Sequence, residues 1–511
     1  MAGIKKIIFV SFFWVCCIMC TAHAKAVQKI YNILQYGAHP GLRTINTSAI
    51  QQAINQAATT GGTVLIPAGN FITGPIVLKS GVELHLADDA VLLGSTSYVD
   101  YKQHMTVIFA KDQNNITITG KGIIDGRGAE LVQNLLEQLR SGAVTDEQWL
   151  IKRPTEQNRP GIILFTDCKN VRVADVTIKN AACWVQTYKQ CTDVNIDNIK
   201  VQSTVYWNND GIDIVDSKNV RVTNSYFNSA DDAICLKSES VTGICENVLI
   251  DNCTARSSAN AFKIGTGSLG GFKNITVNNL TVFDTYRSAI AIETVDGASL
   301  EHVIVSRVRA KNTGNAVFIR LGHRNTDNRY STVNDVLIDD VIVEVPAGKP
   351  DIGYPLEGPL PKIPPHNLIP SSITGIPGHP VQNVTLKNVQ IIYGGGGTKS
   401  KAYVSTDSLS TVTNNITGYP EFSMFGELPS WGIYIRYAEG ITLNNVNLSY
   451  QQPDYRPAIV ANEVKDLKLN SLHIPASETK HVVVLNKVSN PVLTDLQIPG
   501  NTNQAVVNQN K

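Results

Sequence analysis

The stretches NVRVADVTIKN (170–180), DVNIDNIKVQS (193–203), NVRVTNSYFNS (219–229) and NVLIDNCTARSS (247–258) follow one pattern. Each has a polar residue suited to a turn, an alternating run rich in β-branched residues, a second polar turn and a second short strand. Their starting positions are 23, 26 and 28 residues apart. Such a recurrence indicates a repeat architecture, with one repeat for each lap of the chain.

Strands as short as these cannot bury a hydrophobic face alone. Stacked as successive coils, they turn one face inward and pair their backbones with the coils above and below. The fold class is therefore all-β, and we expect a right-handed parallel β-helix. A leucine-rich repeat would need a regular leucine consensus, and a β-propeller would need units of about 40–50 residues.

The segment NTSAIQQAINQAA near the N-terminus is expected to form an amphipathic helix. Asn46 or Thr47 would cap it, and Ile50, Ile54 and Ala57 would lie on one face. A solenoid has an open apolar end that must be covered. We therefore interpret this segment as an N-terminal capping helix.

Two stretches interrupt the repeat, near 127–158 and 346–381. Insertions in solenoids form loops, often beside the binding face. Residues 25–511 are accordingly predicted to be a single β-helix domain with two insertions. The composition gives no reason to divide it, and we expect a monomer.

Residues 1–24 have the features of a cleaved signal peptide: two early lysines, the apolar run IIFVSFFWVCCIM and a small-x-small site at 22–24. We therefore expect a secreted or periplasmic protein. A lipid anchor is the weaker alternative, because Met19 before Cys20 is not small. No later segment has a long uncharged apolar run, so no stable membrane insertion is expected.

The bulk charge and the cysteines exclude some classes of function. The formal net charge is +1, which argues against a nucleic-acid partner held by bulk charge. Six of the nine cysteines follow the signal segment, and none forms a CxxC pair or a Cys/His cluster with zinc spacing. We therefore expect no metal site and no cofactor, with some cysteines packed as small hydrophobic residues.

Three aspartates recur after one lap of the predicted coil. Asp210 lies 21 and 22 residues before Asp231 and Asp232, and a short β-type run follows each position. Rungs lie about 4.8 Å apart, so these carboxylates would lie roughly 5–9 Å apart. Glycosidases use this range, and one of three such close acids should have a raised pKa and serve as a general acid. The alternative is a turn role, because aspartate before glycine is common in turns.

The strands after these acids align in register. Their second and fourth positions are all apolar and should point inward, so the third and fifth positions point outward. Lys263 belongs to the third column, and Glu293 and Arg320 belong to the fifth. These three are candidate substrate-binding residues, and a solvated ladder of salt bridges is the alternative. Asn260 continues the column of Asp210 and Asp232 and is a fourth candidate for substrate binding.

The motifs NNDGID and ADDAICLKS resemble those of glycoside hydrolase family 28, the polygalacturonase-like pectinases, and most of the chain after residue 24 resembles this family. The resemblance implies the pectin-lyase-like form of the β-helix and an inverting hydrolase without a metal. It implies that Asp231 is the general acid, and that Asp210 and Asp232 activate water.

The chain departs from the family pattern on the next two rungs, so the resemblance is to a divergent member. The family usually has Gly-His-Gly where this chain has Ala259-Asn260-Ala261, and Arg-Ile-Lys where it has Ala291-Ile292-Glu293. Cations that would hold a uronate carboxylate are missing at those positions, and Glu293 suits hydroxyl groups better. Lys263 or Arg320 are candidates for a relocated clamp, with His323 and Arg324 nearby in the chain.

The sequence therefore predicts a secreted, inverting glycoside hydrolase that acts on pectic or related polysaccharides or oligosaccharides. The two insertions are compatible with exo-action. Two alternatives stay open: a polysaccharide lyase or epimerase on the same fold, and a β-helix that binds carbohydrate without catalysis.

Overall fold

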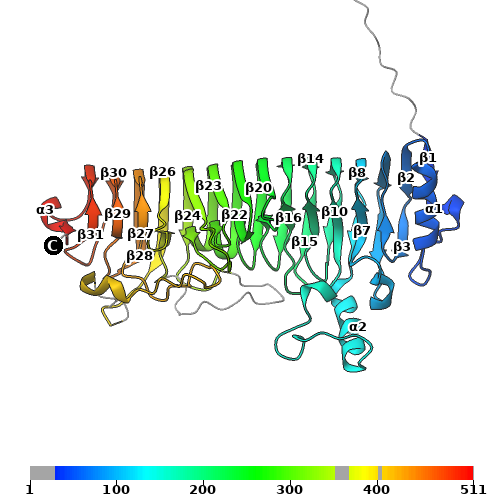
Figure 1. The fold of residues 1–511 in the computed structure, drawn as a ribbon, viewed down its shortest axis with the longest axis horizontal. Helices are drawn as coiled ribbons and strands as arrows, with labels where there is room; N and C mark the ends of the chain where they lie inside the picture. Colours follow the sequence, from blue (N-terminus) through cyan, green and yellow to red (C-terminus); the bar gives the residue numbers. More distant parts are fainter. Residues whose placement is uncertain (1–28, 351–367, 401–405, 510–511) are drawn as a thin grey trace, which may run out of the picture.

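The computed structural model describes residues 29–350, 368–400 and 406–509, and the predicted signal peptide lies outside them. Its strands run in a row along one long axis and form a parallel solenoid (Figure 1). Successive rungs pair in parallel along three ladders, and every strand pairing between the named strands is parallel. The right-handed parallel β-helix expected from the sequence is confirmed.

The first ladder carries the predicted acids at its entrance. Its strands are β4 (Ile76–Val77), β7 (Thr106–Lys111), β10 (Gly161–Thr166), β13 (Gln186–Lys189), β16 (Ile212–Val215), β19 (Ile234–Ser238), β21 (Phe262–Ser268), the ends of β22 (Gly271–Thr294) and β23 (Ser299–Leu321), β25 (Ser371–Thr374), β27 (Ile433–Glu439), β29 (Ile459–Lys465), β31 (Val483–Ser489) and β33 (Val506–Asn508).

The other two ladders close the coil. The second has β1 (Ile30–Asn32), β2 (Gly62–Ile66), β5 (Val82–Leu86), β8 (Asn114–Gly120), β11 (Lys169–Ala174), β14 (Thr192–Asp197), β17 (Lys218–Thr223), β20 (Ile244–Ser257), the starts of β22 and β23, β24 (Thr332–Val345), β26 (Val381–Gly395), β28 (Thr442–Gln452), β30 (Lys468–His473) and β32 (Val492–Gln497). The third has β3 (Gly69–Thr73), β6 (Ala90–Gly94), β9 (Ile123–Asp125), β12 (Thr177–Lys179), β15 (Lys200–Ser203) and β18 (Tyr226–Ser229), and joins β20.

Helices lie at the ends and in the insertions. Helix α1 (Thr47–Ala57) begins after the N-cap Asn46 and buries Ile50, Ile54 and Ala57, as expected for a cap on the apolar end. Helix α2 (Gly128–Arg140) lies in the first insertion, and α3 (Thr502–Ala505) lies near the C-terminus. The 3-10 helices are η1 (Ile33–Tyr36), η2 (Tyr98–Tyr101), η3 (Glu156–Asn158) and η5 (Thr406–Thr411). None of the helices in the described ranges has the length and apolar character to span a bilayer.

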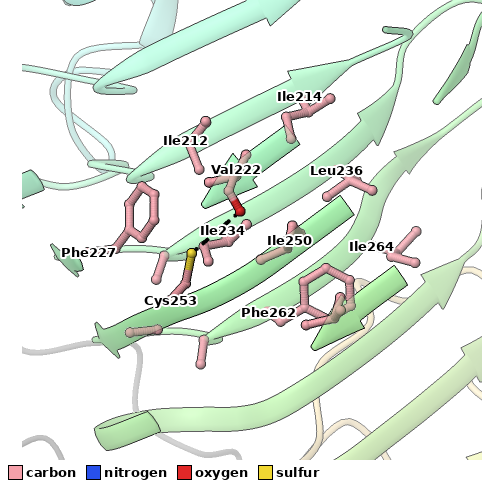
Figure 2. Close-up of a cluster of buried hydrophobic side chains, with 14 of the residues drawn as sticks. Ile212, Ile214, Val222, Phe227, Ile234, Leu236, Ile250, Cys253, Phe262 and Ile264 are labelled. Carbon is pink, nitrogen blue, oxygen red and sulfur yellow. Dashed lines mark hydrogen bonds between the residues drawn. The ribbon is translucent and has the colours of Figure 1, made fainter. Parts of the chain in front are cut away.

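The inner face of the first ladder forms the core, as the alternation predicts. Ile212 pairs with Ile234, Ile234 with Phe262, Phe262 with Ile290, and Ile290 with Val317. These side chains are fully buried and belong to one continuous hydrophobic cluster. Figure 2 shows part of it, with isoleucines of neighbouring rungs stacked beside Phe227 and Phe262. Cys253 belongs to the same cluster, and all six cysteines after the signal segment are buried and free.

Asparagine and aspartate occupy left-handed positions near the start of the strands in the second ladder. Asn219, Asn247 and Asn274 have positive φ angles of 55°, 57° and 56°. Each amide donates to the residue one rung below: Asn247 to Asn219 over 3.1 Å, and Asn274 to Asn247 over 3.0 Å. These residues tolerate the left-handed conformation better than most, which explains their recurrence at the start of each repeat.

The outer face of the first ladder is covered rather than solvated. Lys263, Glu293 and Arg320 are 2%, 0% and 1% exposed, so the alternative of a solvated outer ladder is wrong. A second hydrophobic cluster explains part of the cover, because Phe318 packs there with Leu409 and other residues of the segment between β26 and β27. That segment and α2 protrude from the same side of the solenoid (Figure 1).

The core column makes a stability prediction. Replacing the fully buried Ile264 by alanine should lower the free energy of unfolding by about 2–5 kcal/mol, because the coil cannot collapse onto the cavity. Urea unfolding followed by circular dichroism measures the loss. Ile151→Ala is the control, since that side chain is 86% exposed and its loss should change stability by less than about 0.5 kcal/mol. Equal losses in the two variants would contradict the assigned core.

Candidate active site

The three aspartates meet at the entrance of the first ladder. Asp210 precedes β16, and Asp232 precedes β19 one lap later. The backbone N–H of Gly211 donates to the carbonyl of Asp232 over 2.9 Å, so the two rungs are directly paired. Carboxylate oxygens of Asp210 and Asp232 lie within 4.8 Å of each other, nearer than the range expected from rung spacing. Asp231 keeps partial exposure, whereas Asp210 and Asp232 are buried.

These aspartates do not have the left-handed backbone conformation that favours aspartate in turns. None of Asp210, Asp231 and Asp232 has a positive φ angle, whereas Asn208 has one of 57°. The preference of aspartate for the left-handed conformation therefore does not account for their presence. Burying carboxylates is costly unless cations pair with them, so these acids require cationic partners.

Lys237 forms an ion pair with the first acid, Asp210. Its ammonium group donates to Asp210 over 2.8 Å and also to Asp213, which has no exposed side-chain surface. The Lys237 nitrogen also lies 3.9 Å from the ring centroid of Trp184, a cation–π distance. Burial raises the pKa of Asp210 well above its ordinary value, against the opposing charge of Lys237.

Lys263 forms an ion pair with the second acid, Asp232. Its nitrogen lies 3.0 Å from Asp232 and 3.7 Å from Glu293. The backbone and side-chain N–H groups of Asn260 donate to the other oxygen of Asp232, over 3.0 and 2.8 Å. Asn260 also accepts a hydrogen bond from the Ser288 N–H over 3.1 Å, which fixes its amide. The predicted residues Asn260, Lys263 and Glu293 thus do gather around Asp232.

One cation of the site was missed in the sequence. Arg287 acts electrostatically on both Asp231 and Asp232, and its guanidinium carbon lies 5.9 Å from the ring centroid of Tyr419. It occupies the column of Asp231 two rungs further on, since Ala233, Ala261 and Ala289 align. Extending the Asp231 column, rather than the Asp232 column alone, would have found it. Tyr419 had no pattern to reveal it, because it comes from the segment between β26 and β27.

The site holds more acids than cations. Its five carboxylates and three cations are Asp210, Asp213, Asp231, Asp232 and Glu293, with Lys237, Lys263 and Arg287. Like charges in a buried cluster cannot all ionise cheaply, so some carboxyl groups must keep their protons near neutral pH.

The pKa shifts indicate which carboxyl groups keep their protons. Burial, and then the charges of Asp210 and Asp232, raise the pKa of Asp231 to about 7. Burial also raises the pKa of Glu293 to about 7. Burial alone would raise the pKa of Asp232 as well, but Lys263 and Arg287 outweigh it and hold that pKa below its ordinary value. A proton-bearing acid thus lies next to an ionised one, which is the arrangement expected of an acid/base pair.

Arg320 does not join this cluster by any direct contact in the described residues. Its guanidinium donates to the carbonyls of Gly375, Asn414 and Asn415 over 2.9, 2.7 and 3.1 Å. These bonds tie the segment before β27 to the ladder. The geometry therefore gives Arg320 a role in holding that segment.

The nearby residues of the IRLGHR stretch have partners of their own. Arg324 pairs with Asp296 over 2.7 Å, and its guanidinium carbon lies 6.0 Å from the Tyr419 ring centroid. His323 stacks on Tyr330, with centroids 4.3 Å apart.

Asp210, Asp232 and Cys235 bring possible metal ligands within 4.8 Å of one another. The ammonium groups of Lys237 and Lys263 already donate to the two carboxylates. The Cys235 thiol donates to the carbonyl of Gly265 over 3.1 Å, and burial raises its pKa well above its ordinary value. Metal binding needs a thiolate and free carboxylates, so this donor set does not fit an ion.

Two cavities adjoin the acids on the rungs that precede them. One of about 320 Å³ is lined by the apolar side chains Met105, Ile163 and Leu164 and by Trp184, whose ring contacts Lys237. The other, of about 300 Å³, is polar and reaches Asn208, next to Asp231. Both volumes lie at the lower end of ligand sites, about 300–1,000 Å³.

The fold and the stacked acids agree with the comparison to protein families. The sequence model of the glycosyl hydrolases family 28 matches residues 57–351, more than half of the chain. The chain is therefore a glycoside hydrolase. It belongs to family 28.

Relatives in this family carry related names. An exo-poly-alpha-D-galacturonosidase of Dickeya chrysanthemi is 34% identical over 259 residues, 42% of this chain and 43% of that protein. An exopolygalacturonase of Zea mays is 26% identical over 336 residues, 61% of this chain and 74% of the relative. The match to the Dickeya protein thus spans less than half of its length.

Solved structures agree with the fold. The family 28 exopolygalacturonase of Yersinia enterocolitica superposes with a TM-score of 0.54 at 21% identity, covering 93% of this chain and 80% of its own. The polygalacturonase of Erwinia carotovora gives a TM-score of 0.53 at 19% identity, covering 71% and 93%. At these identities the likeness concerns the fold alone.

Glu293 makes a prediction about stability and pH. Its pKa is 4.5 ordinarily and about 7 in the folded protein, so between these values the folded state holds more protons than the unfolded state. The stabilisation is complete below the lower value and is lost as pH rises through the higher one. Glu293→Gln should therefore show a shallower fall in melting temperature from about pH 4.5 to 7.

Glu301→Gln, at an exposed position in the second ladder, is the matched control and should keep the wild-type slope. A Glu293→Gln slope equal to that of wild type would show that the proton is not held on Glu293.

Proposed function

We propose that this protein is an exported, inverting hydrolase of pectic polysaccharides or oligosaccharides that releases sugar units from chain ends. The supporting observation is the contrast between neighbouring acids: the pKa of Asp231 is raised to about 7, while that of Asp232 is lowered. The galacturonan-directed names of the relatives support the substrate class, and the covered outer face of the ladder supports exo-action.

In the proposed reaction Asp231 gives its proton to the glycosidic oxygen as the bond from that oxygen to the anomeric carbon breaks. A water molecule attacks the anomeric carbon from the opposite face. Asp232 accepts the proton from this water, and Asp210 completes the pair that holds it. Inversion follows because the water attacks opposite the leaving group. The partial exposure of Asp231 suits contact with the leaving group.

Buried lysines hold the two acids of this pair in place. Lys263 holds Asp232 ionised from 3.0 Å, and Lys237 binds Asp210 from 2.8 Å. Both lysines are nearly buried, so their charges are weakly screened by solvent. They act here as positioning residues, because their ammonium groups are already bound by carboxylates.

The Asp231→Asn variant tests the proposal. It should lower kcat on oligogalacturonates by about 10²–10⁴-fold, because the general acid is lost while the fold is kept. Asp193→Asn is the matched control: this exposed aspartate of β14 has a φ of 58°, and its replacement should leave kcat unchanged. Proton NMR of the fresh product should show the inverted anomer released from a chain end.

Unchanged turnover in folded Asp231→Asn would refute the general acid. An unsaturated product would indicate a lyase instead, and binding without any released reducing sugar would indicate a carbohydrate-binding protein.

The pH dependence gives a second test. Turnover needs Asp231 protonated and Asp232 ionised, so kcat should fall as pH rises through about 7. On the acid side it should fall only below the ordinary pKa of aspartate, 3.8, because that of Asp232 is lowered. An alkaline limb near pH 4 instead would contradict the assignment of the proton to Asp231.

A further inference from the structure

The polar cavity next to Asp231 is built by the first insertion. Three cations and one carboxylate line it, namely Lys152, Arg153, Arg159 and Glu156, and the polar side chains Gln148, Gln157 and Asn208 join them. The Asn208 amide lies 3.5 Å from the Asp231 carboxylate. A cationic pocket therefore lies one side chain away from the proposed general acid.

Arg159 fixes the base of this pocket. It is 2% exposed and donates to the carbonyls of Pro154, Ala182 and Trp207 over 3.0, 3.1 and 2.6 Å. It also donates to the side-chain oxygen of Asn208 over 2.7 Å. These bonds tie the end of the insertion to two rungs of the solenoid, so the residues before Arg159 have a defined position. Arg159 itself has little hydrogen-bonding capacity left for a ligand.

Arg153 is placed differently. It is half-buried, and its Nε donates to the same Asn208 oxygen over 3.2 Å. Its guanidinium carbon lies 5.2 Å from the ring centroid of Trp207, which orients the side chain. In the part of the chain that the structure describes, no carboxylate lies within 4.0 Å of its guanidinium nitrogens. Arg153 lines the cavity, and its two terminal nitrogens form a planar pair of donors.

We propose that this pocket is an anionic-sugar subsite in which Arg153 binds the carboxylate of a uronate residue next to the cleaved bond. Arginine matches a carboxylate with two parallel hydrogen bonds, and the exposed Lys152 adds charge at the rim. The proposal deepens the proposed function, since it names the residue that selects an acidic sugar.

The position of the pocket resolves an apparent conflict in the sequence. The rungs that follow the aspartates carry Asn260 and Glu293 where cations would be expected, and Lys263 is bound by two carboxylates. Carboxylate recognition is therefore displaced to residues 148–157, which precede the aspartates in the chain. An insertion supplies it, whereas Arg287, the other cation beside the aspartates, acts on Asp231 and Asp232.

Calorimetric titration with trigalacturonate tests the subsite. The background is the Asp231→Asn protein, so that the ligand is not consumed. Adding Arg153→Ala should weaken binding by about 10–100-fold, because a bidentate charged pair is lost. The carboxyl-reduced trisaccharide should bind equally to both proteins. Arg153→Lys should recover part of the affinity, since it keeps the charge without the planar fork.

Arg140→Ala is the matched control, because Arg140 is an exposed arginine in α2 of the same insertion. It should leave both affinities unchanged. Equal affinity of trigalacturonate for the Arg153→Ala and parent proteins would overturn the subsite, as would no binding of trigalacturonate at all. The proposed hydrolysis is read separately from turnover of oligogalacturonates by the wild-type enzyme, so retained turnover with equal affinities would overturn the subsite alone.

Discussion

The backbone pairing of one lap with the next is the constraint on which the rest of the structure depends. Gly211 donates to Asp232 and Ala233 donates to Asn260, over 2.9 and 2.8 Å. Parallel pairing of this kind aligns residues of successive laps in columns, and neighbours within a column lie about 4.8 Å apart. The apolar columns form the core. The polar columns at the start of the strands bring together carboxylates that are about 20 residues apart in the chain, which no local turn could do.

Stacked acids need compensation, and the solenoid provides it in the same columns and beside them. Lys237 and Lys263 come from the strands that follow the acids, and Arg287 continues the column of Asp231. The cations do not neutralise all the carboxylates, so protons remain on selected groups. The chemical difference between Asp231 and Asp232 thus comes from where the lysines and Arg287 lie, although the two residues are adjacent in sequence.

Much of this could be predicted from the sequence, since the repeat, the capping helix and the inward columns depend on short-range periodicity. The strand register likewise predicted that Asn260, Lys263 and Glu293 lie close together. The burial of Lys263 and Arg320 could not be predicted, because their aromatic neighbours Tyr419 and Phe425 come from a segment outside the repeat. The placement of Arg153 could not be predicted for the same reason, because an insertion lies outside the strand register of the repeat.

Neutron crystallography of the deuterated protein tests the central claim most directly, because it shows which carboxyl groups carry a proton. Crystals should be kept between the ordinary aspartate pKa of 3.8 and about 7. We predict a deuteron on Asp231 and on Glu293, and none on Asp232. A deuteron on Asp232 with a bare Asp231 would contradict the account, since the acid and the base would then be exchanged.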